Sequence, residues 1–234
     1  MPGKKSWLTL LVPLILLTAC AGPFSTLDPA GPSARYAAWL WWSILILFGL
    51  IMALVVSLFL YALYRRRPDF VARSDWRQLR WFLLGGGVLL PITSIVLLLA
   101  FGIPLGHRML PLTPESGDAL RIEVTGHQWW WQVHYPDAGV SLRDEIRIPA
   151  GVPIDFHLTS EDVIHSFWVP RLGGKLDMIP GRTNVLRLQA DAPGEYRGLC
   201  AEFCGLRHAH MQFVVHAMEE EAFQVWLKEE AEDD

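Results

Sequence analysis

Two long apolar runs, at positions 37–64 and 81–105, constrain the fold of this chain more than any other feature of its sequence. Neither run contains an acidic or basic residue. Because about 20 helical residues cross the hydrocarbon core of a bilayer, each run is long enough for one membrane-spanning helix. Aromatic residues at both ends of the first run, such as Trp39 and Tyr64, are typical of the two membrane interfaces. A buried helix of a soluble protein is a poor alternative for uncharged runs of this length.

The segment between the two runs, residues 65–80, carries six arginines and two acids. By the positive-inside rule this short basic loop is expected in the cytoplasm. Two spans return the chain to its starting side, so the residues after about 106 are expected outside the cytoplasm. The second run contains Gly85-Gly86-Gly87 and Pro91, which a membrane helix tolerates where a neighbouring helix packs closely. These residues therefore indicate a large integral-membrane partner.

The N-terminal residues 1–19 have the pattern of a secretory signal, with Lys4 and Lys5 ahead of a short apolar core. The four residues that end in Cys20 resemble a bacterial lipobox, in which this cysteine becomes the lipid-modified first residue. An ordinary signal peptide cleaved nearby, or an uncleaved apolar segment, are the alternatives. Residues 20–36 are rich in Pro, Gly and Ser and are expected to form an exposed extracytoplasmic linker.

Short alternating segments separated by Pro/Gly turns occupy residues 113–218. This pattern predicts a small antiparallel sandwich or barrel. Residues 219–234 are expected to form a short amphipathic helix with an acidic tail. No basic stripe runs along this part of the chain, which argues against a nucleic-acid partner. The expected strands cover residues 120–124, 146–148, 152–158, 185–188 and 213–215.

A cluster of sulfur and imidazole side chains lies near the end of this region. Cys200, Cys204 and His208 are spaced four residues apart, Met211 follows three residues later, and His165 precedes them. Thiolate and thioether are soft ligands and imidazole is intermediate, so the set suits copper better than magnesium or calcium. A mononuclear blue-copper site needs one cysteine, and the second cysteine suggests two thiolates shared between two metal ions.

Two other interpretations of the cluster stay open. A disulfide between Cys200 and Cys204 is reasonable in an oxidising compartment, but it leaves the neighbouring His208 and Met211 unexplained. A structural zinc site with two cysteines and two histidines fits the ligand types, although zinc gains little from a thioether.

The order Cys-x-Glu-x-Cys-x3-His-x2-Met over residues 200–211 resembles the CuA motif of cytochrome c oxidase subunit II. Residues 160–166, 174–182 and 126–131 resemble three further segments of that family, and the two apolar runs agree with its two spans. The resemblance implies a two-helix transmembrane hairpin followed by an all-β, cupredoxin-like Greek-key domain. It places the chain in the bacterial inner membrane, with the copper domain on the periplasmic side.

The resemblance also implies a role for each residue of the cluster. Two thiolates would bridge both copper ions, each histidine would bind one ion, and the methionine and one backbone carbonyl would be weak ligands. The corresponding residues are Cys200 and Cys204 as bridges, His165 and His208 as imidazole ligands, and Met211 and the Glu202 carbonyl as weak ligands.

Further expectations follow from the same resemblance. The Glu202 carboxylate would bind magnesium at the interface with subunit I, and Trp129 matches the position where electrons enter from cytochrome c. Many members carry a glutamate at the start of the second span, whereas residues 80–87 contain no acid, so proton uptake differs or uses another chain. The candidate residues for an acidic face that docks a basic cytochrome c are Asp137, Glu161, Asp162 and Asp177.

The implied function is the electron-accepting subunit of a proton-pumping haem–copper oxidase, with haem and oxygen chemistry in subunit I and with subunit III as a further partner. A quinol oxidase subunit II shares the fold but lacks the copper ligands. A protein similar to nitrous oxide reductase would need a large catalytic domain, for which the chain has no room. A membrane-tethered copper-binding protein outside any oxidase is the remaining alternative.

Overall fold

The computed structural model describes residues 21–65, 76–108 and 119–233 of the chain. Cys20 and the signal-like residues 1–19 lie outside the described residues, as does most of the expected cytoplasmic loop. The described residues form two compact units, which are divided after Ala38 and again after His107.

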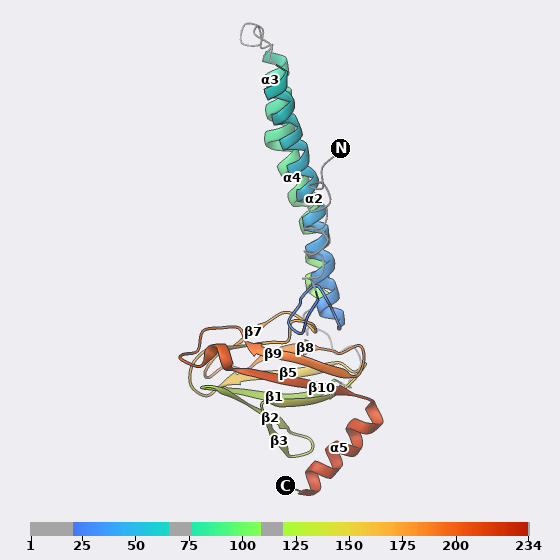
Figure 1. Ribbon diagram of the computed structural model, residues 1–234, viewed down its shortest axis with the longest axis vertical. Coiled ribbons are helices and arrows are strands. Elements are labelled where there is room, and N and C mark those ends of the chain that lie inside the picture. Colours follow the sequence, from blue (N-terminus) through green and yellow to red (C-terminus); the bar gives the residue numbers. More distant parts are fainter. Residues whose placement is uncertain (1–20, 66–75, 109–118, 234) are drawn as a thin grey trace, which may run out of the picture. The chain divides into compact units, whose positions relative to one another are not determined.

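One of the two units is helical (Figure 1). Helix α2 spans Pro32–Tyr64 and begins earlier than the apolar run, because proline is favourable in the first turn, where no backbone N–H donor is needed. The second span consists of α3 (Trp76–Leu84), a π-helical turn η3 (Gly85–Leu89) and α4 (Leu90–Arg108). The three consecutive glycines lie in the π-helical turn, where they weaken regular helix geometry. Both spans are long and apolar enough to cross a membrane.

The second unit contains two five-stranded sheets, ordered β3-β2-β1-β5-β8 and β4-β10-β9-β6-β7 (Figure 1). The sandwich contains the five expected strands, four of them longer than expected and β5 displaced by two residues toward the C-terminus. It adds five strands that the pattern missed, three of them only three or four residues long. The strands are β1 (Leu120–His127), β2 (Trp130–Tyr135), β3 (Val140–Arg143), β4 (Glu145–Pro149), β5 (Ile154–Ser160), β6 (His165–Trp168), β7 (Leu176–Met178), β8 (Asn184–Leu188), β9 (Gly194–Cys200) and β10 (Gln212–Met218).

The sheets are mixed, whereas the sequence pattern predicted antiparallel ones. Strand β5 pairs with β1 in parallel, and β4 pairs with β10 in parallel. The cause is the path of the chain: after the β2–β3 hairpin, β4 belongs to the other sheet, so the chain re-enters the first sheet in the direction of β1.

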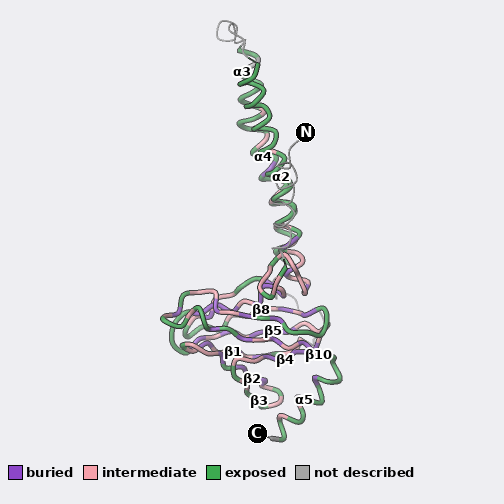
Figure 2. The backbone as a smooth tube through the Cα atoms, in the orientation of Figure 1, coloured by how far each residue is buried: buried purple, intermediate pink, exposed green. Residues whose placement is uncertain are grey.

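The core lies between the two sheets, and alternate strand residues point into it (Figure 2). Ile122 and Val124 of β1 are fully buried, and β5 contributes buried Phe156 in the same way. Several aromatic rings of this core form a connected cluster, in which the Phe167 and Phe213 rings stack with their centroids 4.6 Å apart. This cluster forms a rigid base for the segments described below.

The expected exposed linker is partly wrong, because its second half is bound to the sandwich. Ala30 donates its backbone N–H to the carbonyl of Arg171 and accepts a hydrogen bond from Asp191. Arg35 pairs with the carboxylate of Asp191. These pairings satisfy the polar backbone of the segment, which the content of Pro, Gly and Ser alone did not predict.

The last helix, α5 (Glu220–Asp233), agrees with the expected amphipathic segment and includes most of the expected acidic tail. Phe223 is fully buried, and Trp226 packs edge-to-face on Tyr135 of β2 at 5.5 Å between ring centroids. The Arg147 guanidinium lies 4.9 Å from the Trp226 ring. These contacts fix the apolar side of α5 on the sandwich.

Candidate metal centre

Three short segments carry the cluster of sulfur and imidazole side chains. His165 is the first residue of β6, and Cys200 is the last residue of β9. Cys204 follows in the loop, His208 begins a single 3-10 turn, and Met211 directly precedes β10. Antiparallel pairing of β6 with β9 and of β9 with β10 brings these segments together at one end of three neighbouring strands.

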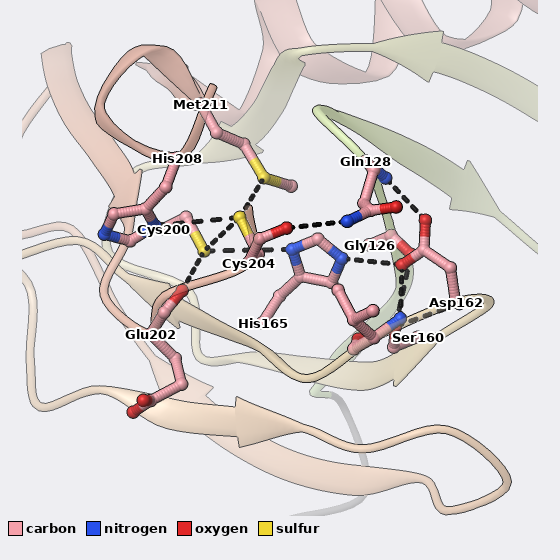
Figure 3. A network of polar contacts seen from close by, with 11 residues as sticks. Gly126, Gln128, Ser160, Asp162, His165, Cys200, Glu202, Cys204, His208 and Met211 are labelled. Carbon is pink, nitrogen blue, oxygen red and sulfur yellow. Dashed lines mark hydrogen bonds and ion pairs between the residues drawn. The ribbon is translucent and has the colours of Figure 1, made fainter. Parts of the chain in front are cut away.

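The predicted donor atoms converge on the two thiols (Figure 3). The Sγ atoms of Cys200 and Cys204 lie 3.8 Å apart, and both cysteines are free. His165 Nδ1 is 3.8 Å from Cys200 Sγ, and His208 Nδ1 is 3.6 Å from Cys204 Sγ. Met211 Sδ lies 3.7 Å from Cys204 Sγ. The Glu202 carbonyl oxygen lies 3.2 Å from Cys200 Sγ.

These separations suit donors around metal ions. Bonds of about 2.3 Å to sulfur and about 2.0 Å to nitrogen place neighbouring donors about 3.5 to 3.8 Å apart at tetrahedral angles. The thiolate, imidazole and thioether set prefers soft or intermediate ions such as copper. The residues present therefore fit the copper that the sequence motif implies.

The two histidines do not occupy equivalent places. His165, Cys200 and Cys204 form a group whose donor atoms all lie within 4.8 Å of one another, and His208 falls outside that group. Figure 3 shows the two imidazoles on opposite sides of the paired thiols. A single tetrahedral ion needs its four donors mutually close, whereas two ions that share both thiolates need one imidazole at each end.

The two thiols differ in acidity before any metal binds. Burial alone would raise the pKa of Cys200, but hydrogen bonds to His165 and to backbone groups lower it to about 6. Burial and the adjacent Cys200 thiolate raise the pKa of Cys204. The pair thus releases one proton readily and holds the second, which a metal ion must displace.

A carboxylate that motif analysis did not assign to the centre contacts the first histidine. Asp162 Oδ1 lies 2.9 Å from His165 Nε2, on the side of the ring away from Cys200. Burial opposes ionisation of Asp162, yet hydrogen bonds from His165 and two backbone amides lower its pKa. Asp162 therefore orients His165. The residue is also exposed, so its place on an acidic docking face stays a prediction.

Two of the predicted residues lie beside the donor cluster. Trp129 is half-buried, and its indole nitrogen is buried without a hydrogen-bond partner among the described residues. Trp131 is buried in the core, while Trp130 stacks on His127 at 4.3 Å between centroids. The Glu202 carboxylate points away from the thiols and lies 3.6 Å from the Lys175 ammonium.

Sequence reasoning also missed Gly126 and Gln128. Gln128 donates its side-chain amide to the Cys204 carbonyl at 2.8 Å, and its backbone N–H to Asp162 Oδ2 at 2.6 Å. Both residues lie within the aromatic segment 126–131 that the motif comparison singled out, but the sequence does not show which residues they contact, because those partners lie far along the chain.

Residues 139–218 match the family described as cytochrome C oxidase subunit II, periplasmic domain. The chain is 37% identical to a cytochrome c oxidase subunit 2 of Alkalihalophilus pseudofirmus, over 92% of this chain and 65% of that protein. It is therefore similar to just under two thirds of that relative's length. It is 34% identical to a cytochrome c oxidase subunit 2 of Bacillus subtilis, over 96% of this chain and 68% of that one.

A relative with another name matches at a similar level. The quinol oxidase subunit 2 of Bacillus cereus is 34% identical over 97% of this chain and 81% of its own length. Among solved structures, the periplasmic domain of subunit II of the Bradyrhizobium japonicum cytochrome oxidase is 32% identical, with a TM-score of 0.47. That likeness covers 49% of this chain and 94% of the other.

Proposed function

This chain belongs to the cytochrome c oxidase subunit II family, and we propose that it accepts electrons from cytochrome c at a dinuclear copper centre. From there the electrons pass to haem in subunit I of a terminal oxidase, where oxygen is reduced and protons are pumped. The two apolar helices and the cupredoxin-like sandwich agree with the architecture that this family implies.

The observation that carries the proposal is the placement of the two imidazoles at opposite ends of the thiol pair. His165 faces Cys200 and His208 faces Cys204, and only the first belongs to the tight donor group. This arrangement favours two ions bridged by two thiolates over one zinc ion with four ligands. It also leaves Met211 and the Glu202 carbonyl as additional donors beside the sulfur pair.

The residues of the sandwich hold this centre in one geometry. When bound, a copper pair bridged by thiolates takes up and releases one electron with little change in its surroundings. The His165 ring packs against Trp131, at 6.0 Å between centroids, and Asp162 holds its second nitrogen. Such packing and hydrogen bonding keep the donor atoms from relaxing and exclude water from the sulfur atoms.

The donor and the partners follow from the site together with the family. The complete ligand set supports cytochrome c as the donor, although relatives include quinol oxidase subunits. Trp129, half-buried beside the ligand loop, is the proposed point where electrons enter. The Glu202 carboxylate is proposed to bind magnesium at the interface with subunit I, where it would exchange its Lys175 partner for the ion. Subunit III is a further proposed partner.

The proposed location is the bacterial inner membrane, with two spans and the sandwich on the periplasmic side. Lipid modification of Cys20 remains part of this proposal. Mass spectrometry of the mature N-terminus tests it, because a mature chain that begins elsewhere or carries an unmodified Cys20 contradicts it.

The test of the centre uses the full chain in a mild detergent, loaded with copper. We expect a purple protein whose electron paramagnetic resonance spectrum shows one unpaired electron shared by two copper nuclei. The Cys204→Ser variant should lose this signal completely, because one bridging thiolate is removed. His210→Gln is the matched control, since His210 is exposed and ends the 3-10 turn that begins at His208, but its side chain bonds no donor residue in the described part of the chain. A colourless protein with one zinc ion, or a single-copper spectrum, would overturn the assignment.

A second measurement separates an oxidase subunit from a membrane-tethered copper-binding protein. Purification of the tagged chain from its native membrane should yield a haem-bearing subunit in equal amount. A chain that binds copper but purifies without haem supports the tethered alternative and contradicts the oxidase role.

A further inference from the structure

The segment 126–129, at the end of β1, supplies no donor atom but contacts both segments that do (Figure 3). We propose that this segment acts as a clamp that sets the position of the two ligand-bearing segments relative to each other, with Gln128 as its main positioning residue. The proposal deepens the function given above and rests on it.

The first arm of the clamp holds the histidine segment. The Gln128 backbone N–H donates to Asp162 Oδ2 at 2.6 Å, and Asp162 Oδ1 lies 2.9 Å from His165 Nε2. The Gly126 carbonyl accepts the backbone N–H of Glu161 at 3.1 Å. Asp162 is therefore fixed from the β1 side, and the orientation of the His165 ring depends on a strand that carries no ligand.

The second arm holds the cysteine loop. The Gln128 side-chain amide donates to the backbone carbonyl of Cys204 at 2.8 Å. The next residue is Gly205, with a φ of +121°, and a side chain there would come within 3.1 Å of Gln128 Nε2 and 3.2 Å of the Trp129 ring. Both the conformation and the close approach require glycine. The loop can thus lie directly against Gln128 and Trp129.

Gly126 is the third part of the clamp, because the absence of a side chain lets the His165 ring lie directly against its backbone. A Cβ atom at this position would lie 2.9 Å from Cδ2 and 3.1 Å from Cγ of His165. The imidazole ring therefore rests on the Gly126 backbone, and any side chain there would displace it from its place beside Cys200. Gly126 thus determines how close the His165 ring can come, and Gln128 fixes the Nε2 atom of that ring through Asp162.

The arrangement gives Gln128 a role that packing does not explain. Gln128 is exposed, yet its backbone N–H holds the Asp162 carboxylate and its side-chain amide holds the Cys204 carbonyl. These two partners belong to different ligand segments. Loss of the side-chain donor should release the Cys204 backbone and leave the buried core intact. The effect should therefore be seen in the metal centre more than in the folding of the sandwich.

Gln128→Met tests this inference in the full-length, copper-loaded chain, since methionine has a similar length and no charge but cannot donate. Gln224→Met is the matched control: Gln224 is exposed on α5, and its side-chain amide donates to Glu220 of the same helix. We expect Gln128→Met to change the copper hyperfine pattern and to lose copper to a chelator about 10-fold faster or more, the usual size of an outer-shell effect. The control should match the wild type.

A metal-free measurement keeps the two proposals apart. In the copper-free chain, Gln128→Met should raise the rate at which iodoacetamide modifies Cys204, because the loop is no longer held. An unchanged hyperfine pattern and chelator rate, with copper bound as in the wild type, would overturn the clamp and leave the centre standing. A wild-type chain without a two-copper signal overturns the centre instead, and the alkylation rates then decide on the clamp alone.

Discussion

The sandwich and the helical unit place their apolar side chains in opposite ways. In the sandwich, residues such as Ile122, Phe156 and Val215 are fully buried. Among the described residues of the helical unit, only Ser94 is buried, and large apolar side chains such as Phe59 are exposed (Figure 2). The sandwich therefore completes its own core, whereas the helices present surfaces that suit lipid or other membrane chains.

Both the stability of the fold and the candidate metal centre are therefore located in the sandwich. Burial of apolar surface from water stabilises the sandwich, and the donor atoms rest on that core. The helices gain nothing comparable from each other, because lipid tails are as apolar as their side chains. Changes of one chemical kind should therefore have different outcomes in the two units. Three predictions test this, and a fourth concerns the sandwich alone.

The largest expected effect follows removal of a core ring. Phe156→Ala removes a fully buried side chain and should lower the free energy of unfolding of the sandwich by about 3–5 kcal/mol. The matched change, Phe59→Ala on α2, should leave the sandwich stability within about 0.5 kcal/mol of the wild type. Urea unfolding in detergent, followed by hydrogen exchange of the strand amides, measures both. Equal effects at the two positions would contradict the comparison.

The reverse test introduces a charge on an exposed apolar position. Val96→Arg, near the middle of the second span, should oppose membrane insertion by about 2.5–3.5 kcal/mol. Leu206→Arg, on the loop of the sandwich, replaces a side chain that is 95% exposed and should be tolerated. Partitioning of each variant between membrane and soluble fractions gives the result. Normal insertion of the Val96 variant would mean that this face contacts neither lipid nor another chain.

A smaller effect is expected from buried hydrogen bonds. The Tyr135 hydroxyl donates to the Arg147 carbonyl at 2.8 Å and accepts the Arg147 N–H at 2.7 Å. Tyr135→Phe leaves both backbone groups without this partner and should destabilise the sandwich by about 1–3 kcal/mol. Ser94→Ala in α4 should cost less than about 0.5 kcal/mol, because the Leu90 carbonyl that it contacts belongs to the helix ladder. Thermal unfolding of both variants measures the contrast.

The smallest expected effect concerns pH and is confined to the sandwich. Burial, and then the charge of Arg121, lower the pKa of His157 below its ordinary value of 6.5. The unfolded chain therefore binds more protons than the folded one just below that value, so the stability should fall as the pH falls through this window. His157→Gln should remove this part of the acid loss, and Arg121→Gln should remove some of it. The urea concentration at the midpoint of unfolding, measured for each variant between pH 7 and about pH 5, tests this. Identical pH profiles for the wild type and His157→Gln would contradict the prediction.

The sequence predicted the helical unit well because hydropathy depends on local composition. The ligand cluster was also local, since Cys200, Cys204, His208 and Met211 lie within one loop. The short strands β6 and β7 were missed because three or four residues carry too little periodicity. The bound half of the expected linker was missed because its partners lie far along the chain.

The contacts of the clamp could not be predicted either, because they join residues that are far apart in the sequence. Gln128 and Cys204 are separated by 76 positions and follow strands of different sheets, so their contact depends on how the two sheets pack. The contact of Asp162 with His165 is equally invisible in the sequence. Residue types thus indicated the chemistry of the centre, and the packing of the sheets determined which side chains support it.

The interior place of β10 in its sheet has a consequence for the order in which the protein is made. This strand is the last of the sandwich to be synthesised, yet it lies between β4 and β9, and Cys200 donates its backbone N–H to the carbonyl of Met211 just before it. Until those residues have been synthesised, β4 and β9 lack the strand that joins them, and the end of β9 at Cys200 lacks its backbone partner. The donor cluster can therefore form only after the last strand of the sandwich has been made.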